Sequence, residues 1–230
     1  MSDTTIESTV ANAAPKRVAG VRPVAVSYNA IGVRALDVAI ALGILIFALP
    51  LLIAIAVIVR AQDGGSSVFA HERVGRGGRM FKCLKFRSMV LDSDRRLAEL
   101  LASDPYARAE WERDHKLKCD PRITRVGAFL RRSSLDELPQ LFNVLRGEMS
   151  IVGPRPIVTA EISRYGRRFQ SYCAVKPGIT GLWQVSGRND VAYRRRVAMD
   201  TIYARKKSLV WDIKLLLLTV PAVLFASGSY

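Results

Sequence analysis

A long apolar run near the N-terminus constrains this chain more than any other feature. Ala35 to Val59 is almost wholly apolar, with Asp37 near its start and Arg60 directly after its end. At ~1.5 Å per residue, about 25 helical residues are long enough to cross the ~30 Å hydrocarbon core of a bilayer. The run therefore predicts a helix that enters a membrane.

Two features favour a helix that dips into one leaflet and returns. Pro50 lies past the middle of the run and removes a backbone hydrogen bond that lipid cannot replace, so it can divide the helix into two legs. Loops on the cytoplasmic side carry an excess of cations, and both flanks of the run are basic: Lys16, Arg17, Arg22 and Arg34 precede it, and Arg60, Arg73, Arg76 and Arg79 follow its last apolar residue. The sequence predicts a re-entrant membrane helix over residues 32–60, and a proline-kinked full span is the alternative.

The remaining chain divides into a tail and one domain. Residues 1–31 are rich in Ser, Thr, Ala and Val without a sustained period, which predicts a disordered N-terminal tail. Asp3 and Glu7 stand where a secretory signal would be basic. A chain of 230 residues that is 50% hydrophobic can bury one sizeable core. Residues 61–230 are therefore expected to form one domain of mixed α/β class.

Charge and cysteine content limit the partners and the compartment. The formal net charge is +15, so the partners should be anionic: nucleic acid, a lipid surface or phosphorylated substrates. Cys83, Cys119 and Cys173 are an odd set without a C-x-x-C spacing, which favours thiols in a reducing compartment over a disulfide framework or a zinc site. The domain is accordingly expected to face the cytoplasm.

Residues 66–89 have the pattern of a β-hairpin. Two partly alternating arms, 68–74 and 79–87, are joined by the glycine-rich stretch 75–78. On a strand Lys85 and Arg87 share one face, so we expect both cations to reach one ligand. The glycines do not form a G-x-G-x-x-G pattern and give no support for a dinucleotide fold.

The other predicted elements surround this small β core. Charged amphipathic helices are expected at 92–103 and from 105 to about 116, with a solvated or membrane-surface face. A short helix over 140–146 ends at Gly147, an apolar stretch follows at 149–152, and a basic helix at 191–207 carries Asp200. The closing apolar run from Val210, interrupted by Pro221, is expected to lie on the membrane surface or in the core.

Two adjacent carboxylates, Asp136 and Glu137, form the main candidate for chemistry. They stand before the 140–146 helix and after Arg131 and Arg132. Ser134 and Glu137 have the S-x-x-E spacing of a capping box, so a purely structural helix start is one interpretation. An acidic pair surrounded by cations is instead typical of a metal-assisted anion site. The surrounding cations in the sequence are Lys82, Lys85, Arg87, Arg155, Lys176 and Arg188.

Three of these cations stand in two distinctive segments. Arg155 lies between Pro154 and Pro156, and an immobilised guanidinium loses less entropy on binding a phosphate, which favours a phosphate site over the alternative of a surface loop. Residues 176–189 read as a strand bracketed by glycine turns with Lys176 and Arg188 at its ends. This pattern indicates a ligand-lining pair of loops, and a plain β-hairpin explains the glycines equally well.

Taken together, the motifs resemble the bacterial sugar transferases, the monotopic polyprenyl-phosphate glycosyl-1-phosphate transferases, and are most similar to the ExoY-like exopolysaccharide branch. The matching segments run in family order over about residues 32–230 and include Asp200. They are Lys85-Phe86-Arg87-Ser88-Met89, Ser133-Ser134-Leu135-Asp136-Glu137-Leu138-Pro139-Gln140-Leu141, Ser150-Ile151-Val152-Gly153-Pro154-Arg155-Pro156 and Pro177-Gly178-Ile179-Thr180-Gly181.

The resemblance implies transfer of a sugar phosphate, with galactose or glucose as the sugar, from a UDP-sugar to undecaprenyl phosphate at the inner membrane of a bacterium. It makes Asp136 the nucleophile of a covalent aspartyl-phosphosugar intermediate and Glu137 the ligand of Mg²⁺. Phosphate binding is expected from Lys85, Arg87, Arg131, Arg155, Lys176 and Arg188, with Asp200 as a further active-site candidate. Membrane lipid is expected as a partner and nucleic acid is not, and the sequence leaves open whether the protein is an oligomer.

Two other classes of function fit part of the sequence. A basic membrane-attached protein that binds nucleic acid or anionic lipid explains the charge, but acidic groups at positions 136 and 137 would weaken phosphate-backbone binding. A structural membrane subunit of a polysaccharide assembly is the third possibility. Release of UMP from a UDP-sugar distinguishes the transferase from both.

Overall fold

The computed structural model describes residues 16–21, 26, 28–114, 117, 119–187 and 191–224. Most of the predicted tail, residues 1–15, 22–25 and 27, lies outside the described residues, as does Arg188. The described part is a mixed α/β structure with a long apolar helix and two small sheets, which confirms the predicted fold class at that level.

The predicted hairpin is present. Strands β1 (Val68–Val74) and β2 (Met80–Phe86) pair antiparallel, and the 3-10 turn η1 (Arg76–Gly78) joins them. The pairing runs from Val68 opposite Phe86 to Val74 opposite Met80. The last residue of the predicted second arm, Arg87, falls just beyond β2.

A second sheet differs from the prediction. Strand β3 (Ser150–Val152) pairs parallel with β4 (Gly178–Thr180), so the 176–189 region is no hairpin, and its strand gives way to the helix α8 (Leu182–Val185). The backbones approach closely where Gly178 of β4 meets Gly153, the residue after β3. A Cβ on Gly178 would lie 2.0 Å from the backbone nitrogen of Gly153. The chain leaves β4 through Gly181, and α8 then buries Trp183.

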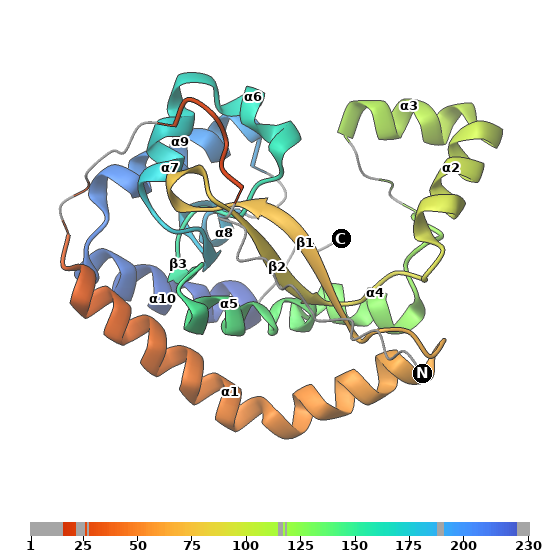
Figure 1. Cartoon of the computed structure of the whole chain (residues 1–230), viewed down its shortest axis with the longest axis horizontal. Coiled ribbons are helices and arrows are strands. Elements are labelled where there is room, and N and C mark those ends of the chain that lie inside the picture. Colours follow the sequence, from red (N-terminus) through yellow and green to blue (C-terminus); the bar gives the residue numbers. More distant parts are fainter. Residues whose placement is uncertain are drawn as a thin grey trace, which may run out of the picture.

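The predicted helices are found near their expected positions. α2 and α3 extend away from the main body, and the other helices surround the two sheets (Figure 1). Their bounds are α2 (Ser93–Ser103), α3 (Pro105–Asp114), α4 (Arg125–Arg132), η2 (Leu135–Glu137), α5 (Gln140–Arg146), η3 (Thr159–Glu161), α6 (Ile162–Tyr165), η4 (Gly166–Arg168), α7 (Phe169–Ala174), α9 (Tyr193–Lys206) and α10 (Leu209–Leu224). Gly147 ends α5 in the left-handed conformation, as predicted.

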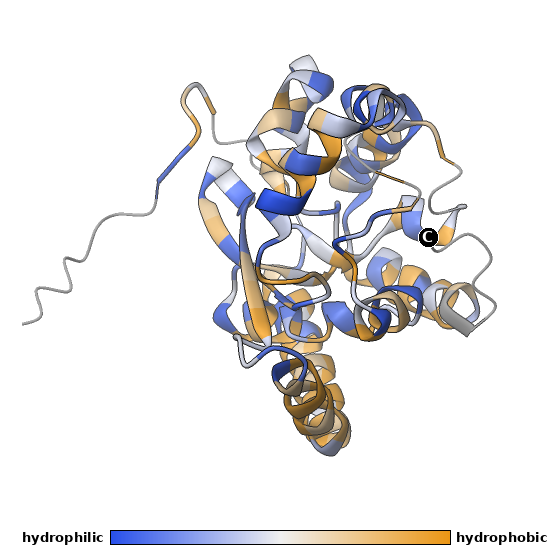
Figure 2. Ribbon diagram, turned by 90° about the vertical axis from the view of Figure 1, so that its right-hand side faces the viewer, coloured by the Kyte–Doolittle hydropathy of each residue, from blue (hydrophilic) through white to orange (hydrophobic). Residues whose placement is uncertain are grey.

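The apolar run forms one helix, α1 (Ala30–Ala61), with Pro50 inside it. By length and composition it is the one described helix that could cross a membrane, and 22% of its most apolar window is buried. The helix bends near its middle, so both ends turn toward the rest of the molecule (Figure 1). It lies at the edge of the structure as an almost continuous apolar rod (Figure 2), and Phe47 near the bend is 91% exposed.

Polar contacts fasten both ends of α1 to the domain. At its start, Arg34 donates to the carbonyls of Val144 and Leu145, at 2.5 and 2.7 Å, at the end of α5. At its end, Arg87 donates to the carbonyl of Val59 and forms an ion pair with Asp63. The helix is thus attached at two distant points to one body.

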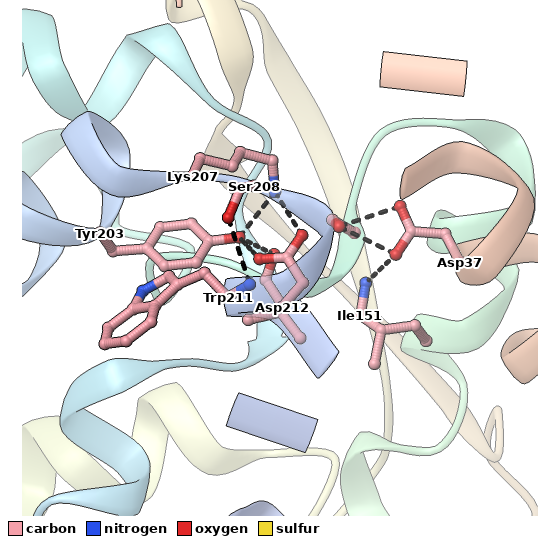
Figure 3. Close-up of polar contacts among 9 residues, drawn as sticks. Asp37, Ile151, Tyr203, Lys207, Ser208, Trp211 and Asp212 are labelled. Atoms are coloured by element: carbon pink, nitrogen blue, oxygen red, sulfur yellow. Dashed lines mark hydrogen bonds and ion pairs between the residues drawn. The ribbon is translucent and has the colours of Figure 1, made fainter. Parts of the chain in front are cut away.

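A buried polar network lies between α1, β3, α9 and α10 (Figure 3). Asp37 of α1 accepts hydrogen bonds from the Ser150 hydroxyl and the Ile151 amide of β3, at 2.8 to 2.9 Å. Beside them, Lys207 Nζ lies 2.6 Å from the Tyr203 hydroxyl and 3.2 Å from Asp212 Oδ2. The apolar helix is therefore joined to the core by a satisfied carboxylate.

The first described residues lie against the hairpin. Met80 donates its backbone N–H to the carbonyl of Lys16, and Val18 donates to Gly78, at 2.8 and 2.9 Å. Val18 and Val21 pack on a small apolar cluster that includes Phe169. The part of the predicted tail that is described is therefore bound to the domain.

Candidate active site

The two carboxylates lie on η2, the 3-10 turn between α4 and α5. Ser134, directly before it, has φ 58 and is the only described non-glycine residue with positive φ. Its side chain makes no capping hydrogen bond, and the Glu137 side chain turns to Lys85 instead. The capping-box interpretation is therefore wrong: the left-handed Ser134 directs both acids toward the hairpin rather than along α5.

Lys85 of β2 bridges the two acids. Its Nζ lies 2.6 Å from Glu137 Oε1 and 3.5 Å from Asp136 Oδ2. The side chains of Asp136 and Glu137 are 10% and 28% exposed, so a ligand can reach the pair from solvent. One ammonium thus contacts both carboxylates of an accessible acidic pair.

Asn143 of α5 fixes the hairpin relative to the acids. This buried side chain accepts a hydrogen bond from the Leu84 amide at 2.9 Å and donates to the Lys82 carbonyl at 2.8 Å. It also donates to Glu148 at 2.6 Å. Because Leu84 directly precedes Lys85, these bonds fix the position of the lysine opposite η2.

The electrostatic setting separates the two acids. Burial raises the pKa of Asp136; Lys85 opposes the rise and the charge of Glu137 adds to it. Burial by itself also raises the pKa of Glu137, but Lys85 and then Arg155 hold that pKa below its usual value. Glu137 is thus suited to a cation, and Asp136 carries the more basic carboxylate oxygen.

Two other predicted cations lie near the dyad. Arg131, in the last turn of α4, donates from Nε to the Ser88 hydroxyl at 2.8 Å, and its charge acts on Asp136. α4 lies close against this segment, because a Cβ on Gly127 would be 2.0 Å from the Ser88 carbonyl oxygen. Arg155 acts on Glu137, and its guanidinium carbon lies 6.0 Å from the centre of the Trp183 ring.

Of the other predicted residues that the structure describes, none is brought to the dyad. Arg87 is bound to Asp63 and the end of α1, because β2 ends one residue before it. The charges acting on Lys176 are Arg34 and then Asp37, at the start of α1, and burial is the main cause that lowers the pKa of Lys176. Asp200 is buried and accepts a hydrogen bond from Tyr165 at 2.7 Å.

Comparison with known proteins gives the family. The sequence model of the bacterial sugar transferases matches residues 28–226. This chain belongs to the bacterial sugar transferase family. The predicted family resemblance is thus confirmed.

Three relatives of this sugar transferase illustrate the match. It is 46% identical over 230 residues, the whole of both chains, to the exopolysaccharide production protein ExoY of Sinorhizobium fredii. It is 55% identical over 197 residues to a UDP-galactose-lipid carrier transferase of Erwinia amylovora, covering 86% of this chain and 41% of that protein. A UDP-glucose:undecaprenyl-phosphate glucose-1-phosphate transferase of Caulobacter vibrioides is 38% identical over 205 residues, with 86% and 71% covered. The chain spans less than half the length of the first two curated relatives it matches.

Sequence reasoning missed two residues of this sugar transferase's site. Asn143 lies among apolar residues of α5 and is buried. A polar residue on the apolar face of this predicted helix could have indicated a buried hydrogen-bonding role. Arg73 of β1 faces the same side of the hairpin as Lys85, and its charge acts on Glu137. The alternation in the first arm, together with the length of the turn, could have predicted that Arg73 shares a face with Lys85.

The donor set of the sugar transferase fits Mg²⁺. Among the described residues no group of three His, Cys, Asp or Glu side chains could hold a metal. Mg²⁺ needs fewer protein ligands when substrate phosphates complete its shell, and one or two carboxylates then suffice. Glu137 is partly exposed and its lowered pKa keeps it ionised, which matches that requirement.

Proposed function

We propose that this sugar transferase moves a hexose-1-phosphate, with galactose or glucose as the hexose, from a UDP-sugar to undecaprenyl phosphate. The products are the undecaprenyl-diphosphate sugar and UMP, in the first step of building an exopolysaccharide repeat unit. The names of relatives that use UDP-galactose or UDP-glucose and a lipid carrier support the substrate class. The observation that carries the proposal is the accessible Asp136–Glu137 pair bridged by Lys85, on a body to which both ends of an apolar helix are fastened.

The first step is attack by an Asp136 carboxylate oxygen on the phosphorus that bears the sugar. A new oxygen–phosphorus bond forms as the bond from that phosphorus to the bridging oxygen breaks, and UMP leaves with the electron pair. Burial makes the Asp136 oxygen poorly solvated and more basic, which favours its action as a nucleophile. The aspartyl-phosphosugar then holds the sugar phosphate on the enzyme.

The second step returns Asp136 to its free form. An oxygen of undecaprenyl phosphate attacks the same phosphorus, and the bond to the Asp136 oxygen breaks. The acceptor is already an anion, so no strong general base is needed. Lys85 and Arg131 stabilise the negative charge that develops around the phosphorus, because both are held beside Asp136.

Glu137 would hold Mg²⁺ through the carboxylate oxygen that Lys85 does not contact. When bound, the ion supplies charge neutralisation as the diphosphate opens. Lys85 on the hairpin contacts both acids and so holds the Glu137 carboxylate in place beside Asp136. Arg155, held beside Trp183, provides a bidentate donor for a phosphate oxygen.

The helix α1 is proposed to be re-entrant, with the catalytic domain on the cytoplasmic side of the membrane. A straight helix of 32 residues would be about 48 Å long and would place its two ends on opposite membrane faces. Here Arg34 at the start and Val59 at the end are both bound to the same domain. A full crossing would break one of these sets of contacts. The bend near the middle of α1, the presence of Pro50 within the helix and the exposed apolar middle support insertion into one leaflet.

Transfer is tested with the purified protein in lipid nanodiscs. UMP release is followed from UDP-galactose and from UDP-glucose, with Mg²⁺ and undecaprenyl phosphate present. We expect repeated turnover of at least one donor to depend on both additions, whereas about one UMP per enzyme should be released with Mg²⁺ when the acceptor is omitted. Label from the sugar phosphate should be trapped on the wild-type chain when the acceptor is omitted. A protein that releases no UMP from either donor would contradict the proposed transfer.

Topology is tested by cysteine labelling in whole cells. Single cysteines are placed in the N-terminal tail and just after Arg60, in a Cys119→Ser background, because Cys119 is exposed. Both labels should react only from the cytoplasmic side. A tail that reacts from the periplasm would establish a full crossing. Pro50→Leu restores the missing hydrogen bond and should convert part of the population to that form.

A further inference from the structure

Arg73 lies on the face of the hairpin that meets the dyad. In the register of the two strands Arg73 is opposite Phe81 and Phe69 is opposite Lys85. Residues directly opposite each other in the pair point to the same face, and so do alternate residues within one strand. Phe69 and Arg73 alternate along β1, so Arg73 shares a face with Lys85. Lys85 contacts both carboxylates from this face. Arg73 is thus a second cation on this face of the hairpin, and its charge helps to lower the pKa of Glu137.

The guanidinium of Arg73 is held in place with donors to spare. It lies 3.3 Å from the Pro156 carbonyl oxygen through Nη1 and 3.2 Å from His71 Nδ1 through Nη2. Its side chain is 18% exposed. An arginine has five N–H donors in a fixed plane, so several remain for another partner. Since arginine only donates, His71 must present an unprotonated Nδ1.

Arg73 and Arg155 form a pair of neighbouring positive charges. After burial, repulsion by Arg155 is the main cause that lowers the pKa of Arg73. Within the described part of the chain, the one carboxylate in ion-pair range of Arg73 is Glu161, at 4.0 Å, and none lies within that range of Arg155. Arg73 Nη1 also lies 3.3 Å from the carbonyl oxygen of Pro156, the residue after Arg155, so geometry as well as charge links the two arginines. Two such cations favour an anion bound between them.

We propose that Arg73 is a phosphate-binding residue: together with Arg155 it grips the diphosphate of the nucleotide sugar, and His71 positions it. This rests on the proposed function, which supplies the diphosphate ligand. The hydrogen bond from Arg73 to Pro156 also couples it to the turn that carries Arg155. Both guanidinium groups therefore meet the ligand from one rigid support.

The test compares Arg73→Met with Arg79→Met. Arg79 is an exposed arginine at the start of β2, so the control removes the same charge from the same hairpin. UDP binding is measured by calorimetry in nanodiscs, and KM for the UDP-sugar is measured at saturating undecaprenyl phosphate. Arg73→Met should raise both the UDP Kd and KM by about tenfold or more, the effect of losing a charge-assisted hydrogen bond, with a much smaller change in kcat. The control should match the wild type.

His71 separates positioning from folding. His71→Ala removes the acceptor for Arg73, whereas His71→Asn offers an amide oxygen in its place. The alanine variant should weaken UDP binding by about threefold, less than the loss of Arg73 itself, and the asparagine variant should restore it. If Arg73→Met does not fold, the two variants of the exposed His71 still provide the measurement. Equal UDP Kd values for wild type, His71→Ala and His71→Asn would contradict the positioning role.

The two proposals fail in different ways. If the wild type releases UMP and folded Arg73→Met binds UDP as tightly as the wild type, the Arg73 site is wrong and the transfer reaction stands. If the wild type releases no UMP from either donor while UDP binding still depends on Arg73, the anion site stands and the proposed reaction is wrong.

Discussion

Two groups of acids and a lysine in this molecule have opposite settings. In the buried network Lys207 and Asp212 are 1% and 2% exposed, and the Tyr203 hydroxyl joins them. At the dyad one ammonium, that of Lys85, is shared by two carboxylates whose side chains remain partly open to solvent. The first group is closed and satisfied, and the second is accessible, with Arg131, Arg155 and Arg73 as further cations acting on it. The same chemical groups thus serve packing in one place and ligand binding in the other.

The contrast between the closed network and the dyad leads to a general expectation about mutations. Removing a member of the closed network leaves a buried charge without its partner, so stability should fall and the chemistry of folded molecules should survive. Removing a member of the dyad takes away a charge that is partly open to solvent, so the chemistry should fail and the fold should survive.

The largest expected effect is at Asp136. Asp136→Asn keeps the shape of the side chain and cannot form the acyl-phosphate, so UMP release should fall by roughly 10³-fold or more. Its melting temperature should be unchanged or higher, because burial raises the pKa of this acid and the ionised form is costly in the folded state. Steady-state assays and calorimetry in nanodiscs measure both quantities. Retained turnover would indicate direct transfer without a covalent intermediate.

Breaking the closed network should give the reverse result. Lys207→Met leaves Asp212 buried without its ammonium and should lower the free energy of unfolding by about 3–5 kcal/mol. The double variant Lys207→Met, Asp212→Leu should cost much less, because no unpaired charge remains. Denaturant unfolding measures the difference. The kcat of folded molecules should stay within a few-fold of wild type in both, and a large loss of kcat would link the network to the chemistry.

The sequence foresaw the hairpin and Lys85 because both depend on local patterns. The alternation in the two arms and the glycine turn set the register, and the register determines which side chains share a face. The same alternation misplaced Arg87, because β2 ends at Phe86 and the chain turns toward α1. Where a strand ends depends on its partners, which a local pattern does not contain.

Other features depend on contacts between distant segments. The spacing of Ser134 and Glu137 fits a capping box, and the left-handed Ser134 arises because α4 and the hairpin fix the chain on both sides of η2. The stretch after Gly181 has strand-forming residues, yet it becomes a helical turn that buries Trp183. Arg188 lies outside the described residues, so its predicted role stays a prediction.

Asp200 offers a third setting, a buried carboxylate without a lysine. Burial raises its pKa to about 7, even though Tyr165 donates to it. The folded state therefore holds a proton that the unfolded chain releases above its lower pKa, and this contribution to stability is lost as pH rises toward 7. Asp200→Asn keeps an acceptor for Tyr165 and cannot ionise.

The variant should accordingly gain stability over the wild type as pH rises from 5 to 8. The gap should reach a few kcal/mol, at about 1.4 kcal/mol for each unit of pKa shift. Urea unfolding at four pH values measures the two curves. Parallel curves would show that Asp200 stays ionised in the folded protein, and the third setting would then resemble the closed network.

A smaller effect is expected at Glu137. Glu137→Gln replaces an ionised ligand with an amide, which is a poorer ligand for a hard cation, so the Mg²⁺ concentration for half-maximal rate should rise about tenfold. Titration of UMP release with Mg²⁺ measures it. Glu148→Gln is the matched control, because Glu148 accepts a hydrogen bond from Asn143 and an amide oxygen can still do so. An unchanged titration for Glu137→Gln would assign this acid to Lys85 alone.

The smallest effect concerns the turn that orients the dyad. Ser134 has φ 58, where a residue with a Cβ costs roughly 1 kcal/mol more than glycine. Ser134→Gly should therefore keep near-normal turnover and be about 1 kcal/mol more stable than Ser134→Ala, as thermal unfolding can measure. A β-branched residue fits this conformation poorly, so Ser134→Val should change the orientation of η2 and of the two acids on it. Turnover should then fall more than stability. If Ser134→Gly loses turnover while its stability is kept, the hydroxyl itself contacts the substrate. The dyad would then include a third member, and its contrast with the closed network would rest on more than charge.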